Sequence, residues 1–232
     1  MIDQNRLLEK AEKLGIAQVP VQALDTYAEL LVEYNQKVNL TAITDPEGIE
    51  DKHFIDSLLF AVQPEVSGRV VDVGTGAGFP GVVAKLYKPQ LQLTLMEPTG
   101  KRVEFLRYVC GRLGIEAEFA KERAEEAARK QWREQFDVAT ARAVANLCML
   151  AEYCLPLVKK GGWFIALKGA GALDEVHEAA GAVKKLGGVF VESRDFVLPD
   201  GSARSLLFYQ KISQTPSVYP RNGGKIAKAP LK

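Results

Sequence analysis

The sequence of 232 residues predicts an α/β fold, in which a mostly parallel β-sheet with helices on both faces ends in an antiparallel hairpin and follows a helical cap. Three observations predict it. Apolar side chains recur at helical spacing through residues 1–66, and short β-rich runs alternate with amphipathic segments through residues 67–212. The last two β-rich runs are separated only by "PDGSA", which is too short for a crossover helix. Residues 213–232 follow as a basic tail.

The cap is expected to consist of helices. Leu24, Tyr27 and Leu31 share one helical face, and "VP" at 19–20 separates this segment from the helix before it. A polar loop with turn-forming residues, "NLTAITDPEG" at 39–48, leads into a third helical segment through "FIDSLLFAV". We interpret this region as a structured cap and not as a linker.

Five β-rich runs of the sheet domain are expected to form its parallel strands: "RVVDV", "LQLTLME", "AEFA", "FDVATA" and "GWFIALKG". Helices are expected to begin near residues 79, 100, 122, 146 and 172. The runs "GGVFVESRDFVL" and "RSLLFYQKI" would form the hairpin. Because sheets of this kind bind ligands outside the carboxyl ends of their strands, we expect the glycine-rich loop after the first strand to line the site.

Charge is nearly balanced overall, with a formal net charge of +1, so bulk charge does not indicate a binder of polyanions. The end of the chain differs, because no acidic residue follows Asp200. Either a solvated, weakly structured tail or a surface that contacts phosphates would explain this bias. The cations of this segment are Arg204, Lys211, Arg221, Lys225, Lys228 and Lys232.

Neither a disulfide framework nor a metal site is indicated. Cys110, Cys148 and Cys154 have no CxxC spacing and no neighbouring histidine, so we expect reduced, buried thiols. The N-terminal "MIDQNRLLEKAEKLG" is charged and helical in pattern, unlike a signal peptide, and no run of about 18 apolar residues occurs. We expect a cytoplasmic, monomeric protein without a membrane partner.

The loop "VVDVGTGAGFPG", residues 70–81, fits two cofactor patterns, GxGxxG and DxGxGxG. Glu97 ends the next strand about 20 residues on, where a carboxylate can hold both hydroxyls of an adenosine ribose. Both patterns therefore predict a cofactor that contains adenosine. The residues that carry them are Asp72, Gly74, Gly76, Gly78 and Gly81.

Asp72 favours one of the two cofactors. A carboxylate so close to the loop disfavours a pyrophosphate, whereas the ammonium and sulfonium of S-adenosylmethionine attract it. Pro80 also lacks the N–H that a phosphate cradle uses. We therefore predict the Rossmann-like sheet of a class I S-adenosylmethionine-dependent methyltransferase. A nicotinamide-dependent Rossmann oxidoreductase is the alternative, although residues 1–64 offer little for hydride transfer beyond His53.

Longer motifs add a resemblance to a known family. "DVGTGAGFPG", "EPTGKRVEFL", "ERAEE", "TARAVANL" and "LPLVKKGGWFIALKG" all resemble the RsmG (GidB) family. In the cap and tail, "YNQKVNLTAIT", "HFIDSLL" and "TPSVYPR" extend the similarity over nearly the whole chain. The resemblance implies an enzyme that methylates N7 of one guanosine in 16S rRNA, within the small ribosomal subunit or an assembly intermediate, with S-adenosylmethionine as cofactor.

The resemblance also implies positions for the cofactor contacts. They fall on Gly74, Phe79, Ala124, Glu125 and Arg142, in addition to the Asp72, Gly76 and Gly78 of the loop pattern. The loop position of Phe79 favours a lid over the adenosine, with a place in the core as the alternative. Glu97 takes the ribose position, where the family more often has aspartate followed by serine, so "EP" is a modest departure.

N7 of guanine carries a lone pair and no proton, so its methylation requires no general base. Positioning, with Arg142 as the candidate residue, would supply most of the acceleration. His53 with Asp56 could indicate acid–base chemistry, but on the helical cap we favour packing or capping for both residues. A noncatalytic ribosome assembly factor with a cofactor-binding fold remains a further alternative.

Basic side chains near the expected site could contact RNA phosphates or form ordinary solvated faces. The candidates are Lys101, Arg102, Lys168, Arg204, Arg221, Lys225 and Lys228.

Overall fold

A computed structural model describes residues 1–142 and 145–232. Residues 143 and 144 of the "TARAVANL" motif lie outside the described residues. A seven-stranded sheet has the order β3-β2-β1-β4-β5-β7-β6. The strands are β1 (Arg69–Val73), β2 (Gln92–Met96), β3 (Ala117–Ala120), β4 (Phe136–Arg142), β5 (Val158–Lys168), β6 (Gly188–Val197) and β7 (Ala203–Lys211).

The predicted fold class is confirmed. Strands β1 to β5 pair in parallel, and β7 pairs antiparallel with both β5 and β6. Strand β7 lies between β5 and β6, and the short turn after β6 places it directly beside that strand. The inner strand β7 buries its apolar run from Leu206 to Tyr209, whereas the edge strand β6 leaves Val189 and Val191 exposed.

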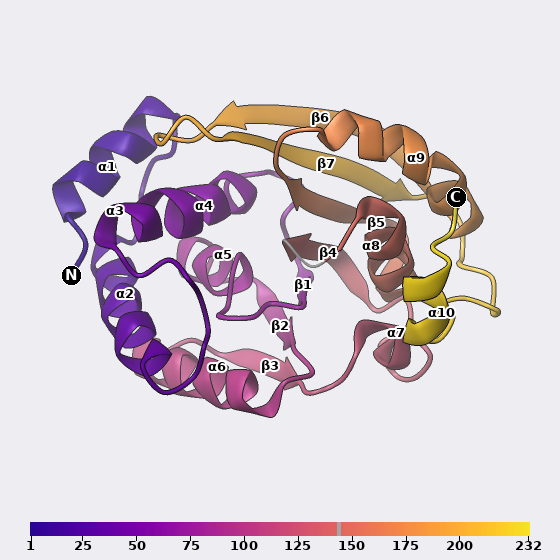
Figure 1. Ribbon diagram of the computed structural model, residues 1–232, viewed down its shortest axis with the longest axis horizontal. Helices are drawn as coiled ribbons and strands as arrows, with labels where there is room; N and C mark the ends of the chain where they lie inside the picture. The colour runs from indigo at the N-terminus through magenta and orange to yellow at the C-terminus, as the bar shows by residue number, and fades with distance from the viewer. Residues whose placement is uncertain (143–144) are drawn as a thin grey trace.

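Helices cover both faces of the sheet (Figure 1). Side chains alternate between the faces, so Val71 and Ala139 join a core under α7, α8 and α9, while Val70 and Val138 join a core on the opposite face. The sheet-domain helices are α5 (Gly81–Tyr87), α6 (Gly100–Leu113), α7 (Ala124–Ala127), α8 (Leu147–Cys154), the 3₁₀-helix η2 (Leu155–Leu157) and α9 (Ala172–Lys185). They begin close to the positions that the sequence predicts.

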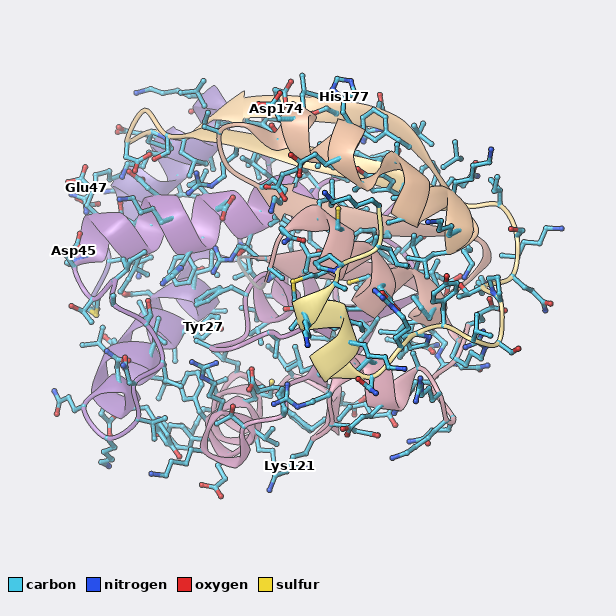
Figure 2. The ribbon with its side chains drawn as sticks, turned by 45° about the vertical axis from the view of Figure 1, so that its right-hand side comes forward. Tyr27, Asp45, Glu47, Lys121, Asp174 and His177 are labelled. Atoms are coloured by element: carbon cyan, nitrogen blue, oxygen red, sulfur yellow. The ribbon has the colours of Figure 1, made fainter. Side chains whose placement is uncertain are left out.

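The N-terminal region is helical, as the sequence predicts, and packs beside α5 and α6 (Figure 1). Its elements are α1 (Gln4–Lys13), α2 (Val21–Asn35), α3 (Pro46–Gly48), the π-helix η1 (Ile49–Ile55) and α4 (Asp56–Ala61). Figure 2 shows Tyr27 of α2 inside the molecule, with Asp45 and Glu47 at the outer edge of the cap. The cap and the sheet share one apolar core, in which Tyr27, Leu31 and Phe105 are fully buried.

The tail is more ordered than the sequence suggests. It contains the helix α10 (Gly223–Lys228), whose N-cap residue Asn222 accepts a hydrogen bond from the main-chain N–H of Lys225. Upstream of the helix, the Arg221 guanidinium lies 2.7 Å from a carboxylate oxygen of the fully buried Glu152 in α8. The expectation of a weakly structured tail is therefore wrong, because this ion pair and the buried Ile226 hold the segment to the domain.

Among the described residues, no helix is long and apolar enough to cross a bilayer.

Candidate functional site

A cavity of about 430 Å³ opens at the carboxyl ends of β1, β2 and β4, within the usual size range of ligand sites, about 300–1,000 Å³. The structure brings together here five of the nine predicted cofactor residues. These are Gly74, Glu97, Ala124, Glu125 and Arg142.

Glu97 is held by main-chain donors at the floor of this cavity. Its side chain is only 3% exposed, Oε2 accepts from the Gly76 N–H at 3.2 Å, and Oε1 accepts from the Thr99 N–H at 2.9 Å. A carboxylate has about four acceptor positions, so both oxygens can still accept hydroxyl donors. The Arg102 guanidinium lies 3.7 Å from Oε2. A buried acceptor in a cavity of this size fits an adenosine ribose, despite the longer glutamate side chain.

Asp72 lies elsewhere than we expected. It is fully buried beneath the loop and does not line the cavity. Its Oδ2 accepts from the Thr75 hydroxyl at 2.6 Å and from the Gly81 N–H at 2.8 Å, so it ties the two ends of the glycine loop together. Burial raises the pKa of this carboxyl to about 6, against the opposing effect of these hydrogen bonds. The structure gives Asp72 a role in shaping the loop, and its other oxygen, Oδ1, is buried with no hydrogen-bond partner among the described residues.

Tyr27 of the cap packs directly on the glycine loop. Its hydroxyl donates to the Ala77 carbonyl, and a Cβ at Gly78 would lie 2.5 Å from that hydroxyl oxygen. Gly78 also has φ of +103°, a conformation that side chains disfavour. Close packing against the cap therefore explains this glycine, and neither Gly76 nor Gly78 lines the cavity.

Phe79 is part of the same contact. Its ring stacks with that of Tyr27, with ring centroids 5.1 Å apart, and with that of His53, with centroids 4.4 Å apart. The residue is buried and its ring does not line the cavity, so the structure does not place it as a lid. The sequence could not distinguish an apolar loop residue that faces a ligand from one that faces a neighbouring helix.

Arg142 ends β4 and lines two cavities at once. Its Nη1 donates to the Lys52 carbonyl at 2.7 Å and to Asp56 Oδ2 at 2.9 Å, and its guanidinium carbon lies 5.1 Å above the Phe79 ring. The side chain is 16% exposed. The cap therefore fixes this arginine at the boundary between the two cavities.

His53 completes the support of Arg142. Arg142 Nη2 lies 3.2 Å from His53 Nδ1, and because a guanidinium only donates, Nδ1 must accept. Nε2 then carries the proton and donates to the Thr41 hydroxyl at 3.0 Å. Burial, and next the Arg142 charge, lower the pKa of His53 to about 3. The imidazole is neutral near pH 7 and acts as a support for Arg142, which accords with the packing role expected for it.

The second cavity, of about 410 Å³, lies at the carboxyl ends of β4 and β5. Two apolar side chains, Ile43 and Leu167, contribute to its wall. Its charged lining consists of Lys52, Asp56, Arg142, Lys168 and Arg204.

Two cavity residues on α8 were missed by sequence reasoning. Met149 and Tyr153 line the first cavity and are spaced four residues apart, so they share one face of the helix that follows β4. That spacing is the signal that could have found them.

The predicted RNA-contacting residues occupy different environments. Arg102 lines the first cavity, Lys168 and Arg204 line the second, and Arg221 is bound to Glu152. Lys101, Lys225 and Lys228 are exposed on the surface.

Comparison with known proteins decides the family. The family model described as rRNA small subunit methyltransferase G matches residues 20–199. The chain belongs to this family. A ribosomal RNA small subunit methyltransferase G from Alkaliphilus metalliredigens is 48% identical over 218 residues, which cover 91% of each chain. The protein of that name from Moorella thermoacetica is 44% identical over 240 residues, with full coverage of both.

Solved structures support the fold of this methyltransferase G family member. An S-adenosylmethionine-dependent O-methyltransferase from Thermotoga maritima has a TM-score of 0.53 at 15% identity, covering 79% of this chain and 72% of that one. An O-methyltransferase family protein from Burkholderia thailandensis has a TM-score of 0.55 at 15% identity, covering 82% and 60%. Family membership confirms the predicted class, an S-adenosylmethionine-dependent methyltransferase, and disfavours the oxidoreductase alternative.

Proposed function

We propose that the protein transfers a methyl group from S-adenosylmethionine to N7 of one guanosine in 16S rRNA, within the small ribosomal subunit or an assembly intermediate. The observation that carries the proposal is the pair of neighbouring cavities that share Arg142. One contains a fixed carboxylate suited to a ribose, and the other is open to a second substrate.

The residues of the first cavity would hold the cofactor. Glu97 accepts the ribose hydroxyls, and Met149 and Tyr153 supply apolar surface beside them. Ala124 and Glu125 begin α7 against the same cavity, and the family resemblance implies that they contact the cofactor. Asp72, Gly76 and Gly78 do not line the cavity and affect cofactor binding indirectly, because they set the shape of the glycine loop.

The reaction fits a site without an acid–base pair. S-adenosylmethionine, when bound, supplies a methyl carbon that bonds to the N7 lone pair while the carbon–sulfur bond breaks, its electrons remain on sulfur, and the positive charge passes to the base. No proton leaves N7, so no residue has to accept one. His53, with its pKa lowered to about 3, is held by Arg142 and Thr41 and is not required as a base.

The decisive experiment supplies methyl-labelled S-adenosylmethionine with small subunits that lack the modification, with naked 16S rRNA and with large subunits as a control. We expect label in small-subunit RNA and none in large subunits. A protein that binds the cofactor but transfers no label to any of these substrates would instead support the noncatalytic assembly factor.

A further inference from the structure

The second cavity contains one acidic side chain among four cationic ones, and this carboxylate is unusually well fixed. We propose that the second cavity receives the acceptor guanine and that Asp56 recognises its Watson–Crick edge. The inference rests on the proposed function and names the residue that would select the base.

Asp56 stands where η1 passes into α4, and its side chain is only 5% exposed. Two arginines hold its two oxygens: Arg142 Nη1 lies 2.9 Å from Oδ2, and Arg204 Nε lies 3.3 Å from Oδ1. Each oxygen of a carboxylate has more than one acceptor position, so these contacts orient Asp56 without exhausting it. The residue nevertheless lines the cavity.

Guanine suits an oriented carboxylate. Its N1–H and its exocyclic amino group are two donors side by side, and a carboxylate can accept from both. Adenine presents a lone pair at N1 in the same place, which a carboxylate repels. Because N7 lies on the Hoogsteen edge and not on the Watson–Crick edge, contact of Asp56 with N1–H and the amino group leaves the methyl acceptor free.

The same contact favours the transfer itself. N7 gains a methyl group without losing a proton, so the base becomes cationic during the reaction. A carboxylate at N1–H and the amino group stabilises that developing charge in a site of low dielectric constant. Asp56 would then strengthen its interaction as the reaction proceeds.

The lining distinguishes a base from a bare phosphate. Lys52 and Lys168 lie 3.3 Å and 2.8 Å from Asp200 and Glu175, so part of their charge is already compensated. The buried Asp56 would repel a phosphate, whereas the apolar walls from Ile43 and Leu167 suit the faces of a base. Phosphate binding is the competing outcome that the test must separate.

The test measures nucleotide binding by calorimetry, with the first cavity saturated by S-adenosylhomocysteine. The probes are guanosine monophosphate, inosine monophosphate, which lacks the amino group, and inorganic phosphate. The wild type should prefer guanosine over inosine monophosphate by about 10- to 100-fold, the range of one well-placed polar contact to a base. Asp56→Asn should reduce this preference to less than about threefold, because an amide cannot accept from both donors.

Two further variants control for misfolding. Gly169→Leu adds a side chain to the lining of the second cavity and keeps the Asp56 carboxylate itself, and the position has room, since the atom nearest to an added Cβ is Arg204 Nη1 at 3.9 Å. It should abolish nucleotide binding while S-adenosylhomocysteine binds normally. Glu178→Gln, which removes one exposed negative charge on α9, should resemble the wild type.

Equal binding of guanosine monophosphate, inosine monophosphate and phosphate by the wild type would overturn the inference, as would an undiminished guanosine preference in Asp56→Asn. Methyl transfer to small subunits is measured in parallel. If the wild type transfers methyl groups but its second cavity does not discriminate guanosine monophosphate from the other probes, only the role of Asp56 is refuted. Selective nucleotide binding without any transfer would remove the proposed function and leave the recognition site.

Discussion

The guanidinium of Arg142 donates from Nη2 to Nδ1 of His53 at 3.2 Å, and this contact joins the end of β4 to the cap. Thr41 and Asp56 complete the arrangement from two other places in the cap. The contact explains why the motifs "NLTAIT" and "HFIDSLL" lie far from the glycine loop in sequence yet belong to the same site. Both motifs fix the arginine that separates the two cavities.

His53→Phe tests this support. The ring can still stack on Phe79 but cannot accept from Arg142, so we expect methyl transfer to fall by about 10- to 100-fold, the loss of one hydrogen bond to a charged group. Affinity for S-adenosylhomocysteine should change by less than about threefold, because the Lys52 carbonyl and Asp56 still hold Arg142 beside the first cavity. His53→Gln restores an acceptor and should recover part of the rate. Equal rates for the wild type and His53→Phe would show that Arg142 needs no support.

The lowered pKa of His53 predicts a pH dependence of stability. Burial lowers this pKa from its ordinary value of 6.5, which applies to the unfolded chain, to about 3 in the folded protein. Below pH 6.5 the unfolded chain therefore binds a proton that the folded protein excludes. The free energy of unfolding should decrease by about 1.4 kcal/mol for each pH unit between roughly 6 and 4 from this group alone. The raised pKa of Asp72 acts in the opposite direction between about 6 and 3.8, because its folded form gains a proton first.

Comparison of the wild type with His53→Gln isolates the histidine, since Asp72 is common to both. Urea unfolding at pH 7.5 and pH 5.5 should show the stability advantage of the wild type shrinking by about 1.4 kcal/mol. A difference that stays constant over this range would contradict a neutral, buried histidine.

Glu97→Gln tests the ribose contact. The amide keeps the size of the side chain but loses one acceptor, so we expect affinity for S-adenosylhomocysteine to fall by about 10- to 100-fold. Glu104→Gln, an exposed change on α6, is the matched control and should bind normally. Calorimetry measures both. Unchanged binding by Glu97→Gln would mean that this carboxylate does not hold the cofactor.

Asp72→Ala tests the loop anchor. Removal of the acceptor of the Thr75 hydroxyl and the Gly81 N–H should lower the free energy of unfolding by about 1–3 kcal/mol and weaken cofactor binding through a looser loop. If Asp72 acted only through direct contact with the cofactor, Asp72→Ala would instead weaken cofactor binding without lowering the free energy of unfolding. Denaturant unfolding together with calorimetry separates the two outcomes.

Arg221 and Lys225 of the tail should differ in their effects. Arg221→Ala leaves the buried Glu152 without its guanidinium, although the residue-221 N–H, 2.7 Å from Glu152 Oε1, remains. We expect the free energy of unfolding to fall by about 3 kcal/mol, the lower end of the range for a buried ion pair that loses one partner. Lys225→Ala should leave stability unchanged but reduce by about one the slope of log affinity for small subunits against log salt. A stable Arg221→Ala protein would contradict the docked tail.

Much of the fold followed from local signals. The five parallel strands and the hairpin were predictable because each depends on a signal within a short stretch of sequence. These signals are the β-rich composition of a strand, the helical spacing of apolar residues, and the short connection between the last two strands. The tail was not, because its order depends on a pair between Arg221 and Glu152, which are far apart in sequence.

The site residues also divide into those that local sequence could place and those that it could not. Glu97 could be placed because a strand end fixes the position of the residue that follows it. Asp72 and Phe79 could not, since a loop side chain can turn toward the ligand or toward the protein, and the packing of Tyr27 and His53 decides which. The second cavity depends on the junction of cap and sheet, which no local pattern reveals.

The most direct test of the methyl transfer maps the modified atom. Small subunits that lack the modification are incubated with the protein and S-adenosylmethionine, and their RNA is then cleaved chemically at 7-methylguanosine. We predict cleavage at a single guanosine of 16S rRNA, absent when the protein or the cofactor is omitted. Methyl incorporation without cleavage would contradict N7 as the acceptor, and cleavage at many guanosines would contradict selection of one.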